Sequence, residues 1–220
     1  MNFTIVNAAQ RSDAWKAARL GRLTGSRAAD MLSTGRSGAE AAGRRNLRVQ
    51  LVLERVTGKP QERSFQSAAM QHGIETEDEA CATYEALTGT LLERTGFLSH
   101  NTLMVGCSLD SHVGDFEGIV EIKCPIPATH WEYLQTGKVP GDYLKQVTHG
   151  LWVSGAQWCD WMSYEPSFPE TLRAKIVRVP RDEAAIDAYQ RAALTFLSEV
   201  AIECDKVAVM AAGAPPVGTM

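Results

Sequence analysis

The chain has 220 residues, with 22 Lys or Arg against 26 Asp or Glu and a formal net charge of −4 at pH 7. This length suits one large domain that buries enough surface to fold without a disulfide or a structural metal. An acidic total argues against a histone-like or polybasic binder, whose affinity comes from neutralised phosphates. Five cysteines without a CxxC pair give no support to a zinc ribbon or a thioredoxin-type motif. Because neither a signal-peptide pattern nor a long apolar run is present, we expect a soluble, intracellular protein.

The expected helices of the first 88 residues cover residues 12–20, 27–32, 39–56 and 66–88. Ser12 is placed to cap the first of them, and Gly21, Gly58 and Gly89 follow three of their ends. After Gly89 the hydrophobic period changes to two, which indicates strands.

The second half mixes strands and helices. Residues 103–110 and 119–124 have the pattern of short strands joined by a loop of hairpin length, residues 111–118. A helix at 142–154, strands at 158–164 and 172–179, and a long amphipathic helix at 183–207 follow. Residues 208–220 are rich in Ala, Gly and Pro, so we expect a disordered tail. The sequence therefore predicts one α/β domain over residues 1–207, with a central mixed β-sheet flanked by helices.

The charge is distributed in blocks along the chain. Residues 1–60 carry eleven Lys or Arg against four acidic residues, whereas residues 61–121 carry two against eleven. Two interpretations fit this asymmetry: solvated helix faces, or a polyanion-binding surface beside a carboxylate-rich site. The net charge alone therefore does not decide against a nucleic-acid partner.

Glu121 and Lys123 alternate with Val120 and Ile122 in an otherwise apolar strand. Residues two apart share a face of a strand, so the two charged side chains point the same way. Burying them is costly unless they are paired or bind an ion. The predicted hairpin brings Asp110, at the end of the preceding strand, to the same place.

An Asp, a Glu and a Lys in one small volume suit a metal-dependent phosphodiesterase. Two carboxylates match the oxygen ligands that Mg²⁺ prefers. A nearby lysine can orient the attacking water and stabilise charge that develops on the phosphorus oxygens. A cross-strand Glu–Lys pair at a sheet edge is the alternative, and the triplet alone does not distinguish the two.

Glu77 is a candidate third carboxylate. Ile74 precedes it by three residues and Cys81 follows by four, so Glu77 shares a helix stripe with apolar neighbours, whereas Glu75 and Glu79 fall on more solvated faces. The alternative is an acidic first turn that complements the helix dipole.

Arg19 and Ser26 form a second candidate site. Ser26 is expected to begin a helix after a glycine, presenting backbone N–H groups and a hydroxyl, and Arg19 ends the preceding helix. A helix N-terminus beside an arginine can bind phosphate, and capping without a ligand is the alternative.

The order and spacing of these residues resemble those of a known family. Six motifs, in order and spacing, are similar to those of the lambda exonuclease family of phage recombination nucleases, the alkaline exonucleases or YqaJ-type viral recombinases. They are Ser12 to Trp15 with Arg19 to Gly21 and Thr24 to Ser26, Gly73 to Glu77, Cys107 to Asp110, Glu121 to Pro125, Tyr143 to Val147, and Leu151 to Val153.

The resemblance implies a restriction-endonuclease-like core that degrades the 5′-ended strand of linear duplex DNA and leaves 3′ single-stranded overhangs. It implies Mg²⁺ as cofactor, with Mn²⁺ as a substitute, and a ring-shaped homotrimer. A phage-type single-strand annealing protein is the implied partner, and the cytoplasm of a bacterial host is the implied location of this phage- or prophage-derived protein.

The resemblance also implies roles for residues of the acidic site. Asp110 and Glu121 correspond to metal ligands, and Lys123 to the residue that positions the water. Glu77 corresponds to a helix carboxylate near a second metal position, and Gln146 to a glutamine that supports the site.

At the DNA end, Arg19 and Ser26 correspond to a pocket for the 5′-phosphate, and Ser108 to a further site contact. Met70 stands where the family places an apolar wedge that parts the terminal base pairs, with a core methionine as the alternative.

Two other functions fit the same residues. A structure- or site-specific endonuclease shares the core motif and would cut covalently closed duplex. A non-catalytic DNA-end-binding recombination scaffold would bind DNA without turnover in Mg²⁺ or Mn²⁺.

Overall fold

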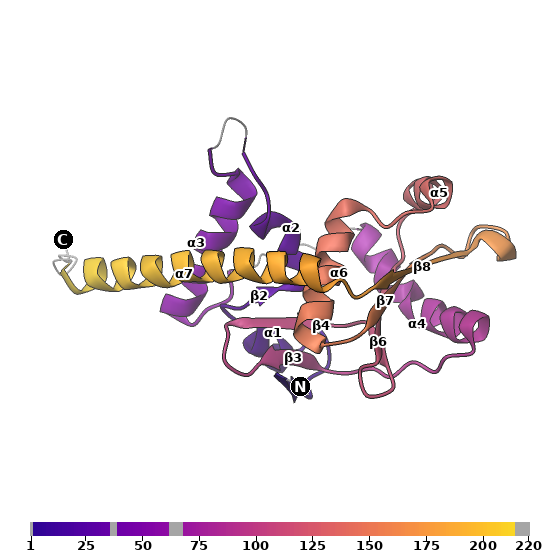
Figure 1. Ribbon diagram of the computed structural model, residues 1–220, viewed down its shortest axis with the longest axis horizontal. Helices are drawn as coiled ribbons and strands as arrows, with labels where there is room; N and C mark the ends of the chain where they lie inside the picture. The colour runs from indigo at the N-terminus through magenta and orange to yellow at the C-terminus, as the bar shows by residue number, and fades with distance from the viewer. Residues whose placement is uncertain (1, 36–38, 62–67, 214–220) are drawn as a thin grey trace.

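The computed structural model describes residues 2–35, 39–61 and 68–213 of the chain (Figure 1). Its elements confirm the α/β class and most of the predicted helices and strands. They are β1 (Phe3–Val6), α1 (Asp13–Arg19), β2 (Leu23–Thr24), η1 (Gly25–Arg27), α2 (Ala28–Met31), α3 (Ala42–Thr57), α4 (Ala68–Thr88), β3 (Phe97–His100), β4 (Val105–Ser108), β5 (Ser111–Val113), β6 (Gly118–Lys123), α5 (Pro127–Thr136), α6 (Gly141–Ser154), β7 (Trp158–Tyr164), η3 (Glu170–Leu172), β8 (Ala174–Pro180) and α7 (Glu183–Gly213).

The strands form two four-stranded mixed sheets instead of the single central sheet that was predicted. Their orders are β1-β3-β4-β2 and β5-β6-β7-β8, and the pairs β2/β4 and β6/β7 are parallel. The predicted hairpin between residues 103–110 and 119–124 is wrong. β4 pairs with β3, which the sequence analysis missed, and β5 forms inside the expected loop and pairs with β6, with Ser111 opposite Val120.

Helix α6 joins the two sheets. It packs on β3 and β4 of the first sheet and on β6 and β7 of the second. His149, fully buried in α6, donates through Nε2 to the Gly106 carbonyl of β4 (3.0 Å), so its Nδ1 accepts from the Tyr189 hydroxyl of α7 (2.8 Å). These bonds fix α6, and with it the side chains that α6 presents to β6.

Helix α4 covers the opposite face of β6. Ala80 and Tyr84 pack with Val120 and Ile122 of β6 in a small second core that also includes Met162 of β7. The burial of this face explains why Val120 and Ile122 alternate with charged residues. The packing also places the N-terminal half of α4 beside the end of β6.

Helix α7 extends well beyond the body of the protein, past α3 (Figure 1). Arg44 and Arg48 of α3 form ion pairs with Glu199 and Glu203 of α7 at 2.8 and 2.9 Å. The tail predicted from residue 208 is wrong as far as Gly213, because the alanine-rich sequence continues the helix. Residues 214–220 lie outside the described part. Among the described helices, none is long and apolar enough to cross a membrane.

Candidate active site

Asp110 and Glu121 lie opposite each other at the start of the β5–β6 hairpin. Since Ser111 pairs with Val120, Asp110, which directly precedes β5, comes next to Glu121. The Ile122 backbone N–H donates to Asp110 Oδ2 at 2.7 Å. This bond continues the hydrogen bonding between β5 and β6, with the Asp110 side chain as the acceptor, and fixes the carboxylate beside β6. The sequence therefore predicted the juxtaposition correctly but through the wrong strand pair.

Lys123 and Gln146 both contact one oxygen of Glu121. The Lys123 ammonium pairs with Glu121 Oε1, and Gln146 Nε2, from α6, donates to the same atom. Lys123 Nζ also lies 5.1 Å from the ring centroid of Tyr143, within range of a cation–π contact. These contacts fix the orientation of the Glu121 carboxylate and of the ammonium.

Burial raises the pKa values of both carboxyls. Burial, with a further contribution from Asp110, raises the pKa of Glu121 to about 7, although Lys123 and Gln146 oppose the change. Burial also raises the pKa of Asp110 against the effect of Lys123. For Lys123, burial lowers the pKa but Glu121 and Asp110 raise it, and its pKa lies above the ordinary value. The cluster thus holds more negative charge than its ammonium can balance.

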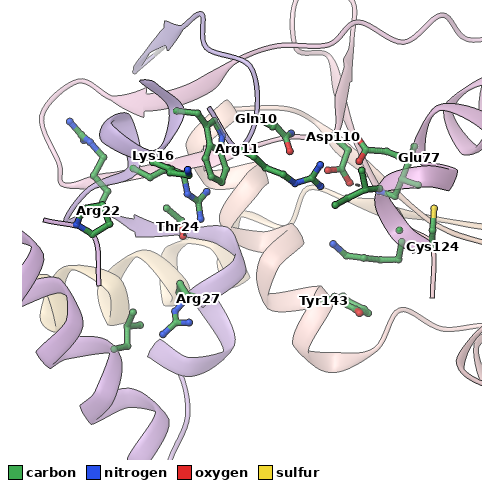
Figure 2. Close-up of a pocket in the computed structure, with 18 of the residues that line it drawn as sticks. Gln10, Arg11, Lys16, Arg22, Thr24, Arg27, Glu77, Asp110, Cys124 and Tyr143 are labelled. Atoms are coloured by element: carbon green, nitrogen blue, oxygen red, sulfur yellow. Dashed lines mark hydrogen bonds between the residues drawn. The ribbon is translucent and has the colours of Figure 1, made fainter. Parts of the chain in front are cut away.

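Glu77 lies on the same side of the site. It projects from α4 next to Asp110 (Figure 2), and its pKa is raised by burial and then by the Asp110 charge. Glu77 is half-buried, whereas Glu75 and Glu79 are exposed, as the helix wheel predicted. Within the described part of the chain, no three His, Cys, Asp or Glu side chains are already gathered in a metal-binding arrangement.

Arg19 lies in a network of hydroxyl and ring contacts. Its guanidinium donates to Ser108 Oγ (3.3 Å) and Thr24 Oγ1 (3.5 Å) and lies 4.1 Å from the centroid of the Trp15 ring. Trp15 Nε1 also donates to Ser108 Oγ, at 2.9 Å. The structure thus brings Arg19 and Ser108 together. Ser26 lies next to them, with its hydroxyl 3.4 Å from Thr24 Oγ1.

We expected Ser26 to begin an α-helix, but it does not. It lies inside η1, a 3-10 turn, and α2 starts only at Ala28. Thr24 precedes η1 without a capping bond from its side chain. The expected cradle of helix N–H groups is therefore wrong in detail, and Ser26 contributes an exposed hydroxyl instead.

Glu54 is a site residue that the sequence analysis missed. It is 5% exposed, lines the cleft, and its Oε2 accepts from the Gly21 N–H at 2.8 Å. Gly21 has φ +66, in the left-handed region, and its carbonyl accepts from Arg55 Nε at 2.8 Å. These bonds fix the turn between Arg19 and Thr24. The available signal was the position of Glu54 three residues after Leu51, on the buried stripe of α3.

A cleft of about 1070 Å³ connects the two groups of residues. Asp110, Glu77 and Lys123 line it together with five cations of the N-terminal third. These cations are Arg11, Lys16, Arg19, Arg22 and Arg27. Figure 2 shows Asp110 and Glu77 on one side, with Lys16, Arg22 and Arg27 on the other. The charge asymmetry of the sequence therefore has a spatial counterpart. Met70 belongs to the first turn of α4, and its side chain lies outside the described part.

Two mixed sheets flanked by helices, with a hairpin that carries Asp110, Glu121 and Lys123, define the restriction-endonuclease-like class of fold. The chain belongs to the family of the YqaJ-like viral recombinase domain, which matches residues 14–157. Among curated proteins, no relative matches the chain.

Solved structures agree with this family. The chain is similar to an alkaline exonuclease (LHK-Exo) from Laribacter hongkongensis, at 37% identity and a TM-score of 0.83 over 91% of this chain and 98% of that one. LHK-Exo in complex with dAMP matches with the same values. A phage-related exonuclease from Haemophilus somnus 129PT matches at 13% identity and a TM-score of 0.66, over 86% of this chain and 96% of that one, and shows likeness of fold alone.

Proposed function

We propose that this protein is a Mg²⁺-dependent exonuclease of phage-type recombination that degrades the 5′-ended strand of linear duplex DNA and leaves 3′ overhangs. The observation that carries the proposal is the buried Glu121 held beside the partly buried Asp110 and Lys123, which line a cleft that also carries basic residues. The 37% identity with an alkaline exonuclease over nearly the whole chain supports the same reaction class.

The acidic cluster fits a hard divalent cation. Asp110, Glu121 and Glu77 offer only carboxylate oxygens, the donors that suit Mg²⁺ and Mn²⁺. Burial is the main cause of their raised pKa values, and a divalent cation beside them would favour the ionised carboxylates. These three residues would hold the metal. When bound, it would stabilise charge on the phosphorus oxygens and lower the pKa of the attacking water.

Lys123 and Gln146 prepare the site for reaction. Both donate to Glu121 Oε1, so the carboxylate keeps one orientation without reorganisation during the reaction. The Lys123 ammonium lines the cleft, where it can orient the attacking water and stabilise charge on the scissile phosphate. Truncation of Lys123 should therefore lower the rate by roughly 10²–10³-fold, typical of a preorganised electrostatic group.

The basic side of the cleft would bind the DNA end. Arg19, with Ser108 and Ser26 beside it, would receive the 5′-phosphate, because a guanidinium among hydroxyls offers several charge-assisted donors. Met70 would act as the wedge. The homotrimeric ring, the single-strand annealing partner and action in the cytoplasm of a bacterial host belong to the same proposal and rest on the family resemblance.

The test uses linear and covalently closed duplex DNA, with Mg²⁺ or with EDTA. We expect wild-type protein to digest only the linear duplex and only with Mg²⁺. Glu121→Gln and Lys123→Ala should lose most of the digestion but still fold, as shown by a cooperative unfolding transition, whereas Glu75→Gln, at an exposed glutamate of α4, should keep wild-type digestion. Cutting of the closed circle would favour an endonuclease. Stable binding without turnover in Mg²⁺ and Mn²⁺ would contradict an enzymatic role.

A further inference from the structure

Arg11 occupies a backbone conformation in which an arginine is unfavourable. Its φ is +68, in the left-handed region that glycine adopts without strain. The Ser12 N–H donates to the Ala9 carbonyl at 3.1 Å and closes a four-residue turn with Arg11 at its third position. Glycine is the preferred residue at a turn position with positive φ. An arginine placed there points to a role for its side chain.

The residues on both sides of Arg11 are anchored. Gln10 Nε2 donates to the Leu109 carbonyl at 3.3 Å, one residue before Asp110. Ser12 Oγ accepts from the Trp15 N–H at 3.2 Å and caps α1. Arg11 is therefore held next to the acidic hairpin from one side and next to the Arg19 network from the other.

The Arg11 side chain extends across the cleft toward Asp110 (Figure 2). Its positive charge acts on both Asp110 and Glu77 and lowers their pKa values against the larger effect of burial. Arg94 acts on the same two carboxyls, but its guanidinium pairs with Asp78. Arg11, by contrast, has no ion-pair partner among the residues that the structure describes.

A charge count of the cleft indicates what Arg11 would bind. Glu77, Asp110 and Glu121 carry three negative charges when ionised and Lys123 carries one positive charge, so one divalent cation would bring this set to neutrality. A phosphodiester that enters the cleft then adds one negative charge. The positive charge of the Arg11 guanidinium balances it. A guanidinium also matches the two non-bridging oxygens of a phosphate in geometry.

We propose that Arg11 binds the phosphodiester undergoing cleavage, from the side of the cleft opposite Lys123. The proposal rests on the proposed nuclease function and adds a phosphate contact distinct from Arg19, which serves the 5′-terminal phosphate. Arg11 would thus act on every linkage that is cleaved, whereas Arg19 would discriminate between kinds of DNA end.

The first test compares Arg11→Ala, Arg11→Lys and Arg11→Gly. We expect Arg11→Ala to lower kcat/KM on linear duplex by roughly 10–100-fold, as for the loss of a hydrogen bond to a charged group. Arg11→Lys should keep part of the rate. Arg11→Gly should lose as much rate as Arg11→Ala without lowering Tm, because glycine accepts the left-handed φ. Arg191→Ala, which removes an exposed cation of α7, is the matched control and should digest normally.

The second test measures binding without turnover, with Ca²⁺ in place of Mg²⁺. One duplex carries a neutral methylphosphonate at the linkage nearest the 5′ end, and the other carries the natural phosphate. Wild-type protein should bind the neutral duplex more weakly, and Arg11→Ala should lose less affinity on the same change because one of the charges that contact this linkage is already absent. An equal loss for both proteins, or wild-type kinetics of Arg11→Ala, would overturn the role of Arg11. Absence of digestion by wild-type protein would instead overturn the proposed function.

Discussion

At the scale of single residues, the site is defined by charges that the fold holds close together. Glu121 is 6% exposed and shares its Oε1 between Lys123 and Gln146, with Asp110 directly opposite. Such an arrangement costs folding free energy in the metal-free protein, because burial and like charge disfavour the ionised carboxyl. This cost should be measurable as a change of stability with pH.

The stability of the metal-free protein should fall as the pH rises through the titration of Glu121. Its folded pKa is about 7, whereas an unfolded glutamate titrates near pH 4.3. Between these values the native state holds the proton more tightly, so stability is lost with rising pH. Glu121→Gln removes this dependence, and its Tm relative to wild type should increase from pH 5 to pH 8.

Mg²⁺ supplies the control for that measurement. A ligand that binds only the native state stabilises it, so at pH 8 Mg²⁺ should raise the Tm of wild-type protein and not that of Glu121→Gln. A Tm difference between Glu121→Gln and wild type that stays constant or shrinks as the pH rises would contradict a raised pKa of Glu121 in the folded protein.

At the scale of elements, a short turn held by helix α3 positions Arg19. The turn from Arg19 to Thr24 contains Gly21 in the left-handed region, clasped by Glu54 and Arg55 from α3. A Cβ on Gly21 would lie 2.7 Å from Arg55 Cγ. Helix α3 thus fixes the direction in which α1 presents Arg19.

Gly21→Ala tests this positioning. The left-handed conformation should cost ~1–2 kcal/mol of unfolding free energy, measured by chemical denaturation. Displacement of Arg55 should also reduce the preference for 5′-phosphorylated over 5′-hydroxyl ends, as Arg19→Ala should do directly. Gly58→Ala is the matched control, because Gly58 has the same φ of +66 with no atom near its would-be Cβ. Equal end preference in wild type and Gly21→Ala would contradict the role of the turn.

The elements also show what the sequence could predict. Long periodic segments such as α3, α4 and α7 were predictable because their apolar stripes are sustained over several turns. The four-residue strands β1 and β3 were missed because they are too short for a period of two to stand out. Without β3, residues 103–110 lacked their true partner and were assigned to the wrong hairpin.

The proximity of the candidate site residues was predicted more fully than the fold around them. Glu121 and Lys123 stand out because charge in an apolar strand is costly wherever that strand pairs. Asp110, only eleven residues earlier, reaches Glu121 through either hairpin. Glu54 and Arg11 gave weaker signals. The role of Glu54 depends on its hydrogen bond to the turn at Gly21, far away in the sequence. The role of Arg11 depends on a backbone φ that the sequence does not reveal.

At the scale of the whole molecule, the net charge of −4 combines a basic N-terminal block, an acidic block over residues 61–121 and a nearly balanced remainder. Part of the N-terminal basic block is structural, since Arg44 and Arg48 pair with carboxylates of α7. Five other cations of this block, Arg11, Lys16, Arg19, Arg22 and Arg27, line the cleft together with Asp110 and Glu77. A cleft with one cationic and one carboxylate side suits a polyanion that is held on one side and cleaved with a metal on the other.

The measurement that tests this account most directly follows each strand of a linear duplex labelled separately at its two 3′ ends. One 5′ end carries phosphate and the other carries hydroxyl, and Mg²⁺ is present. We predict that the strand with the 5′-phosphate disappears first, from its 5′ end, leaving the complementary strand intact as a 3′ overhang. Release of the 3′ labels at the start of the reaction, which indicates digestion from the 3′ ends, would contradict the account. Equal loss of both strands would contradict it as well.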